Sequence, residues 1–309
     1  MIEVYRGSPN TWECDEMGHM NVRFYVAKMM EGLAGFSHCI EMPHAFKPNS
    51  PSTLQPRDQH IRFLREAHPG RPFSMRAGVL EVRDASALIY QQLDHGDGTP
   101  CAAYRTWVDH IDTETGRLFS WSARTRAALE SHIVEPPEKL APRSIDPTAP
   151  VRGSATMADA DTVGAPVLGN GVVSGDQCDL FGWMKAEMYI ARISDAVPNL
   201  MAAWRENVAA AARAKGEEVT SGAAVLEYRL RYRKWPKAGD RVQVRSTLGD
   251  CTDKILSFVH WVIDPDSGEA WCTTEAVAVT FDLNTRKVIT APPQHMEALR
   301  ALAPTGLTV

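Results

Sequence analysis

The chain has 309 residues, of which 44% are hydrophobic and 23% are charged, a composition typical of a folded protein with a core. Its net charge of −5 argues against a general nucleic-acid binder, and no apolar run is long enough for a membrane helix. Six cysteines without C-x-x-C spacing and ten histidines without paired ligand spacing argue against a metal site. With no signal peptide visible, we expect a cytoplasmic protein that has no nucleic-acid or membrane partner.

A seven-residue motif occurs twice in the chain. Residues 14–20 read Cys-Asp-Glu-Met-Gly-His-Met, and residues 178–184 read Cys-Asp-Leu-Phe-Gly-Trp-Met, 164 positions later. Tyr25 and Tyr189 keep the same spacing. So long a period indicates a duplicated domain, since solenoid repeats have periods of about 20–50 residues. We expect two copies of one module, with the chemistry kept in the first copy and partly lost in the second.

In the first half, a short strand over residues 4–12 is expected to lead into the motif. Residues 22–39 are apolar on nearly all sides, which predicts a long buried helix. Further strands are expected at residues 78–83, 87–93 and 101–111, with a turn at 96–98.

The middle of the chain is rich in proline. Its prolines are Pro136, Pro137, Pro142, Pro147 and Pro150. Proline removes a donor and fixes φ, so this stretch is not expected to continue a helix or a strand, and should run over the surface. We therefore predict an N-terminal domain at residues 1–134, a linker at 135–161 and a C-terminal domain at 162–309.

The second half repeats the order of the first, with a strand near residues 172–174 and a helix over 186–214. Residues 226–233 alternate between apolar and charged side chains, a period of two that predicts a half-buried strand. More strands are expected at residues 241–248, 254–263 and 270–281. A buried helix followed by antiparallel strands, twice over, is an α+β pattern.

The pattern Asp-x-x-Gly-His-Met-Asn at residues 15–21, followed by a helix with Tyr25 in its first turns and a strand meander, resembles the hotdog-fold thioesterases. It is most similar to the 4-hydroxybenzoyl-CoA thioesterase-like branch, in a tandem or double-hotdog arrangement. A looser likeness lies in Tyr-x-x-x-Pro-x-x-Gly-Asp at residues 232–240. The resemblance implies an antiparallel sheet around each helix, two sheets joined side by side with acyl thioesters at the seam, and a homo-oligomer of double hotdogs.

The chemistry of thioester hydrolysis needs a carboxylate that attacks or activates water, and donors for the developing oxyanion. The resemblance assigns the carboxylate to Asp15, for which the alternative is a helix cap. It implies that His19 and Asn21 orient substrate or water, although the first also suits a buried histidine and the second a helix start. Backbone amides around Gly18 and Met20 are expected to polarise the carbonyl.

The second copy keeps Asp179 and Gly182 but has Trp183 and Lys185 in place of the histidine and the asparagine. A bulky indole predicts a blocked or reshaped pocket, so Asp179 is expected to be a cap or a relic, with one working site per chain. The related acyl-carrier-protein thioesterases have an asparagine two residues before the histidine. Met17 stands there in this chain, which argues against a three-part Asp-Asn-His site.

The densest basic cluster lies on the strand after the second helix. It contains Arg229, Arg231, Arg233, Lys234 and Lys237. One interpretation is a solvated strand face that discourages edge pairing. The other is a landing site for the phosphates of coenzyme A.

The predicted activity is hydrolysis of a small-molecule acyl thioester, an acyl-CoA or an acyl carrier protein thioester, as in fatty acid metabolism. It needs no metal or organic cofactor. One alternative is a hotdog-fold hydratase or dehydratase, because residues 174–176 read Ser-Gly-Asp, although the histidine of that motif is absent. The other alternative is a non-catalytic module that binds acyl thioesters.

Overall fold

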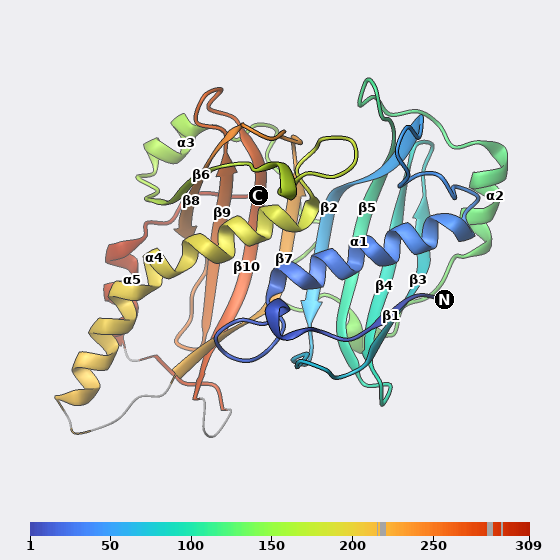
Figure 1. The fold of residues 1–309 in the computed structure, drawn as a ribbon. Helices are drawn as coiled ribbons and strands as arrows, with labels where there is room; N and C mark the ends of the chain where they lie inside the picture. Colours follow the sequence, from blue (N-terminus) through green and yellow to red (C-terminus); the bar gives the residue numbers. More distant parts are fainter. Residues whose placement is uncertain (215, 217–220, 283–286, 292) are drawn as a thin grey trace. The chain divides into compact units, whose positions relative to one another are not determined.

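The computed structural model describes residues 1–309 except 215, 217–220, 283–286 and 292 (Figure 1). The chain forms two compact units. The first comprises Met1–Arg143 and Asp176–Met188, and the second comprises Ser144–Gly175 and Tyr189–Val309. The division after Arg143 falls inside the predicted linker. The second copy of the motif therefore groups with the first unit and not with the rest of its own module.

The first unit contains an antiparallel sheet with the strand order β1-β3-β4-β5-β2. Its strands are β1 (Ile2–Gly7), β2 (Ser52–Phe63), β3 (Phe73–Val82), β4 (Ser86–His95) and β5 (Pro100–Asp112). The strands predicted at 78–83, 87–93 and 101–111 are confirmed as parts of β3, β4 and β5. The strand expected at 4–12 ends earlier, because a 3-10 turn, η1 (Thr11–Glu13), precedes the motif.

Helix α1 (Val22–Cys39) has the predicted bounds and lies across the sheet of the first unit (Figure 1). Its side chains Leu33 and Phe36, and that of Ile40 at its C-cap, are fully buried in the core with residues of β2 to β5. Gly35 permits the close approach of β1, since a Cβ at that position would collide with the Val4 carbonyl oxygen. A second, shorter helix, α2 (Ala123–Ser131), is capped by Ser122.

The second unit has the sheet order β7-β10-β9-β8-β6. Its strands are β6 (Val167–Val172), β7 (Ser221–Tyr232), β8 (Arg241–Leu248), β9 (Ile255–Ile263) and β10 (Ala270–Asp282), and its helices are α3 (Met157–Thr162), most of α4 (Ala186–Arg213) and α5 (Pro293–Leu302). Read from β6 to β7, this order matches that of the first unit read from β1 to β2, because β6 to β10 follow one another in the chain as β1 to β5 do. The predicted duplication and the α+β class are confirmed. Among the described residues, no helix has the length and apolarity needed to cross a membrane.

The linker is fastened to both sheets by arginine side chains. In the first unit, Arg62 donates to the carbonyl oxygens of Lys139 (2.9 Å) and Ala141 (2.6 Å), and Arg105 donates to that of Leu140 (3.1 Å). These contacts hold η2 (Glu138–Leu140), a 3-10 turn inside the stretch that was expected to form no helix.

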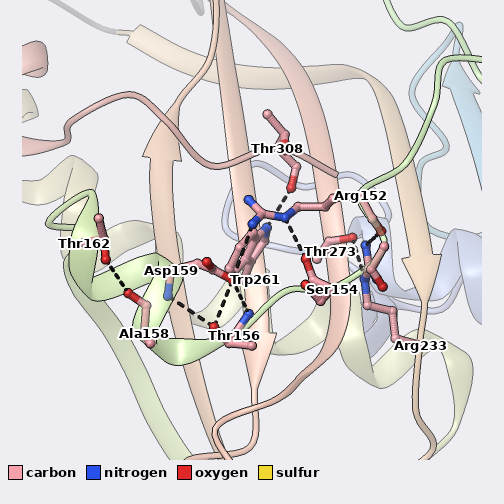
Figure 2. A network of polar contacts seen from close by, with 11 residues as sticks. Arg152, Ser154, Thr156, Ala158, Asp159, Thr162, Arg233, Trp261, Thr273 and Thr308 are labelled. Atoms are coloured by element: carbon pink, nitrogen blue, oxygen red, sulfur yellow. Dashed lines mark hydrogen bonds and ion pairs between the residues drawn. The ribbon is translucent and has the colours of Figure 1, made fainter.

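The second unit holds the rest of the linker in the same way. Arg229 donates to the carbonyl oxygens of Asp146 (3.2 Å) and Ala149 (2.9 Å), and Arg233 donates to that of Arg152 (2.8 Å; Figure 2). Helix α3 then begins at Met157, before the predicted end of the linker at residue 161. A capping box between Thr156 and Asp159 starts it (Figure 2).

These contacts correct the interpretation of β7. Tyr228 and Leu230 are buried as predicted, but Glu227 (2% exposed) and Arg229 (4% exposed) are buried as well. The linker covers them: Glu227 accepts hydrogen bonds from the amides of Ser144 and Ile145. The prediction of a solvated face is therefore wrong for Arg229, whereas Lys234 and Lys237 of the same cluster are exposed. The contacts of Arg229 and Arg233 do not support a coenzyme A site, and that role stays a prediction for the cluster.

Replacing Arg229 by Met is expected to lower the free energy of unfolding by about 2–3 kcal/mol, because two carbonyl oxygens of the linker lose a charged donor. Urea unfolding measures this loss, and limited proteolysis should cut the linker faster. Arg6→Met is the control, since Arg6 is exposed and its ion pair is with Glu3, an exposed neighbour on the same strand. Unchanged stability of Arg229→Met would contradict the fastening role.

A buried histidine lies in the sheet of the second unit. His260 on β9 is 1% exposed, and its Nδ1 atom is 2.7 Å from the Ser246 hydroxyl. Burial lowers the pKa of His260 from 6.5 to about 3. The unfolded chain therefore binds this proton at a higher pH than the folded chain does. Stability is lost as the pH falls from about 6.5 towards 3.

For His260 the expected loss is about 2 kcal/mol between about pH 7 and about pH 5, at 1.4 kcal/mol per pH unit below the unfolded pKa. The measurement is urea unfolding at both pH values for the parent and for His260→Gln, whose side chain does not titrate. We expect the variant to lose about 2 kcal/mol less than the parent over this interval. Equal losses would show that His260 does not control this part of the pH dependence.

Candidate active site

The first copy of the motif folds into a closed turn just before α1. Cys14 and Met20 pair as an isolated antiparallel bridge, and the Asp15 amide donates to the His19 carbonyl oxygen (3.0 Å). Gly18 has a φ of 77°, in the left-handed region that costs other residues about 1–2 kcal/mol. The turn thus requires glycine at this position, and it brings the side chains of Asp15 and His19 together.

The carboxylate of Asp15 is held at one oxygen and faces an imidazole at the other. Its Oδ1 atom accepts a hydrogen bond from the Met17 amide (3.0 Å), and its Oδ2 atom is 3.3 Å from His19 Nδ1. The two side chains are 18% and 14% exposed. This geometry is that of an oriented base or nucleophile with limited access to water. The structure thus brings together Asp15 and His19, two of the predicted site residues.

Asn21 caps the helix. Its side-chain Oδ1 atom accepts a hydrogen bond from the Arg23 backbone amide (2.9 Å), and its backbone amide donates to the Glu13 carbonyl oxygen (2.9 Å). These contacts explain why an asparagine ends the motif. A role for Asn21 towards the substrate stays a prediction.

The two amides predicted to polarise the carbonyl already have acceptors. The Gly18 amide donates to the Asp15 carbonyl oxygen (3.0 Å), and the Met20 amide donates to that of Ala67 (2.7 Å). The geometry therefore does not support these two donors. Within the described part of the chain, the amides of His19 and Val22 have no protein acceptor. Val22 is the first residue of α1, where the helix dipole favours negative charge.

A second carboxylate, which the sequence analysis missed, lies on the other side of the histidine. Glu66 belongs to the segment after β2, and its Oε1 atom is 3.8 Å from His19 Nε2. Its Oε2 atom is 3.8 Å from His68 Nε2, and His68 Nδ1 is 3.2 Å from the Gly18 carbonyl oxygen. No motif spacing links Glu66 to His19, since 47 residues separate them in the sequence.

The second copy of the motif forms the same turn with a different use of its aspartate. Asp179 Oδ1 accepts hydrogen bonds from the amides of Phe181 (2.9 Å) and Trp183 (3.0 Å), and Gly182 has a φ of 81°. Burial raises the pKa of Asp179, and these amides offset part of the rise. The contacts agree with the expected role as a cap.

A charged pair lies beneath the first turn. Lys28 of α1 is 2.9 Å from Glu13 Oε1, and the two side chains are 14% and 8% exposed. Glu13 Oε2 also accepts a hydrogen bond from the Asn10 amide (2.8 Å). The pair therefore ties the chain that enters the turn to the helix that leaves it. Across the described residues, no group of three or more His, Cys, Asp or Glu side chains has the geometry of a metal site.

Comparison with known proteins identifies the family. The family model of the thioesterase-like superfamily matches residues 9–133 and 172–299, which include both copies of the module. The chain therefore belongs to the thioesterase-like superfamily. No curated protein matches the chain.

Solved structures show the same fold. The chain is similar to the 12:0-ACP thioesterase from Umbellularia californica, with a TM-score of 0.66 and 11% identity over 89% of this chain and 93% of that chain. It is also similar to an acyl-ACP thioesterase from Bacteroides thetaiotaomicron, with a TM-score of 0.61 and 12% identity over 89% and 96% of the two chains. The predicted tandem hotdog fold is confirmed.

Replacing Lys28 by Met is expected to lower the free energy of unfolding by about 3–5 kcal/mol, because the buried Glu13 carboxylate loses its charged partner. A double-mutant cycle with Glu13→Gln measures the coupling by urea unfolding. The double variant should lose clearly less stability than the sum of the two single variants. Additive losses would mean that the pair does not hold the turn.

Proposed function

We propose that this protein hydrolyses acyl thioesters, with acyl-CoA as the substrate, at the site formed by Asp15 and His19. One observation carries the proposal. Just before the buried helix, Asp15 Oδ1 is fixed by the Met17 amide and Asp15 Oδ2 faces the His19 imidazole. Membership of the thioesterase-like superfamily supports the reaction class.

The chemistry follows from the proposed site. Asp15 either takes the proton of an attacking water or attacks the thioester carbonyl carbon itself, forming an anhydride that water then opens. In both routes the C–S bond breaks, the acyl group leaves as a carboxylate, and the sulfur ends as the protonated thiol. The amides of Val22 and His19 are the proposed donors to the developing oxyanion.

The thiol carrier is the finer part of the proposal. The two similar solved structures are thioesterases of acyl carrier protein, so both carriers belong in the substrate panel. A single turnover in ¹⁸O-labelled water separates the two routes. If Asp15 is the nucleophile and water opens the anhydride at the Asp15 carbonyl carbon, the label ends in Asp15 and the acid product carries none. In the general-base route the label ends in the acid product and Asp15 stays unlabelled.

Replacing Asp15 by Asn is expected to lower kcat for thiol release by about 10²–10⁴-fold, because the side chain can no longer accept a proton or attack. The assay follows free thiol over a panel of acyl-CoA and acyl carrier protein thioesters.

The duplicated turn supplies the matched control. In Asp179→Asn the new oxygen can still accept from the amides of Phe181 and Trp183, so kcat should stay within about twofold of the parent. The assignment is wrong if Asp15→Asn keeps its activity or if Asp179→Asn loses it. Loss of enoyl-CoA absorbance without thiol release would indicate a hydratase instead.

A further inference from the structure

Glu66 has a fixed position beside the histidine of the candidate site. The Ala67 carbonyl oxygen accepts from the Met20 amide (2.7 Å), and the Ala67 amide donates to the Tyr25 hydroxyl (3.2 Å). One residue earlier in the segment, the Arg65 amide donates to the Cys101 carbonyl oxygen (3.2 Å). Glu66 is thus held by backbone contacts on both sides, next to the residue that follows His19.

The side chains around His19 alternate between acid and imidazole. The order is Asp15, His19, Glu66 and His68, with the separations of 3.3, 3.8 and 3.8 Å given above. His19 Nε2 is buried and makes no hydrogen bond in the described structure, and the Glu66 carboxylate lies 3.8 Å from it. The carboxylate thus faces this side of the ring at ion-pair distance, without a hydrogen bond.

The second module gives independent support, because it lost both members of the pair. Trp183 stands 164 positions after His19. β2 (Ser52–Phe63) and β7 (Ser221–Tyr232) are offset by 169 positions in the sequence, so Trp235 is the counterpart of Glu66 in the second module. The aspartate is kept in both copies, whereas the histidine and the glutamate are both replaced by tryptophan. A pair that works as a unit is expected to disappear together.

We infer that Glu66 is a positioning residue of the active site: it holds the His19 ring from the Nε2 side so that Nδ1 stays directed at Asp15. This inference rests on the proposed function. A ring held from one side only can rotate or shift, and a displacement of about 1 Å in an active site can cost about 10²-fold in rate.

The test compares Glu66→Gln and Glu66→Ala with Glu16→Gln, a control in the same turn whose side chain is exposed. We expect kcat to fall about 10-fold for Glu66→Gln, which keeps an oxygen facing the ring, and about 10²-fold for Glu66→Ala, which does not. KM should stay within about twofold of the parent in both variants. The control should match the parent. Activity of a folded Glu66→Ala variant within twofold of the control would overturn the inference. If the Ala variant fails to fold, Glu66→Gln decides.

Nuclear magnetic resonance separates this inference from the proposed function. The ring-nitrogen signals of His19, assigned with His19→Gln, should move in Glu66→Gln and stay unchanged in Glu16→Gln. If the parent releases no thiol from any substrate, the proposed function fails, and the His19 signals alone decide the role of Glu66. Unchanged His19 signals in Glu66→Gln would refute the positioning role.

Discussion

The hydrogen bond from the Met20 amide to the Ala67 carbonyl oxygen joins the two segments of the candidate site. On one side is the turn that carries Asp15 and His19, and on the other is the segment after β2 that carries Glu66. The helix begins two residues after Met20, at Val22, directly after the Asn21 cap, so the bond also fixes where α1 starts. It uses a backbone amide that would otherwise be free for a substrate. The Met20 amide is therefore not available to a substrate, and its hydrogen bond instead fixes the segments that carry Asp15, His19 and Glu66.

The duplicated module shows that the turn and its chemistry are separable. Both copies keep the aspartate, a glycine with positive φ and a bridge across the turn. In the first copy one aspartate oxygen faces an imidazole. In the second copy one oxygen takes two amides of its own turn, among them that of Trp183. The same backbone thus supports the proposed catalytic carboxylate when a histidine stands four residues later, and a cap when a tryptophan does.

Sequence patterns predicted the elements whose signals are local. The helix at 22–39 is correct because its apolar residues and its Asn21 cap lie within one segment. β2 was not predicted because Pro56 and the charges after it interrupt the alternation. The structure places a register shift between Pro56 and Asp58, where a residue without an amide donor does least damage. Glu66 was missed for another reason: its partner is distant in sequence, and only the paired loss in the second module marks it.

The burial of charges on β7 also depends on a distant segment. A proline-rich stretch has fewer amide donors than carbonyl acceptors, so it cannot join a sheet ladder but can still accept hydrogen bonds. Arginine has five donors and no acceptor, which makes it the complement of such a segment. Arg62 and Arg229 each use this match to bind two linker carbonyl oxygens within their own unit. The composition that indicated a loose connection therefore also explains why the connection is held, and why Arg229, one member of the basic cluster, is buried.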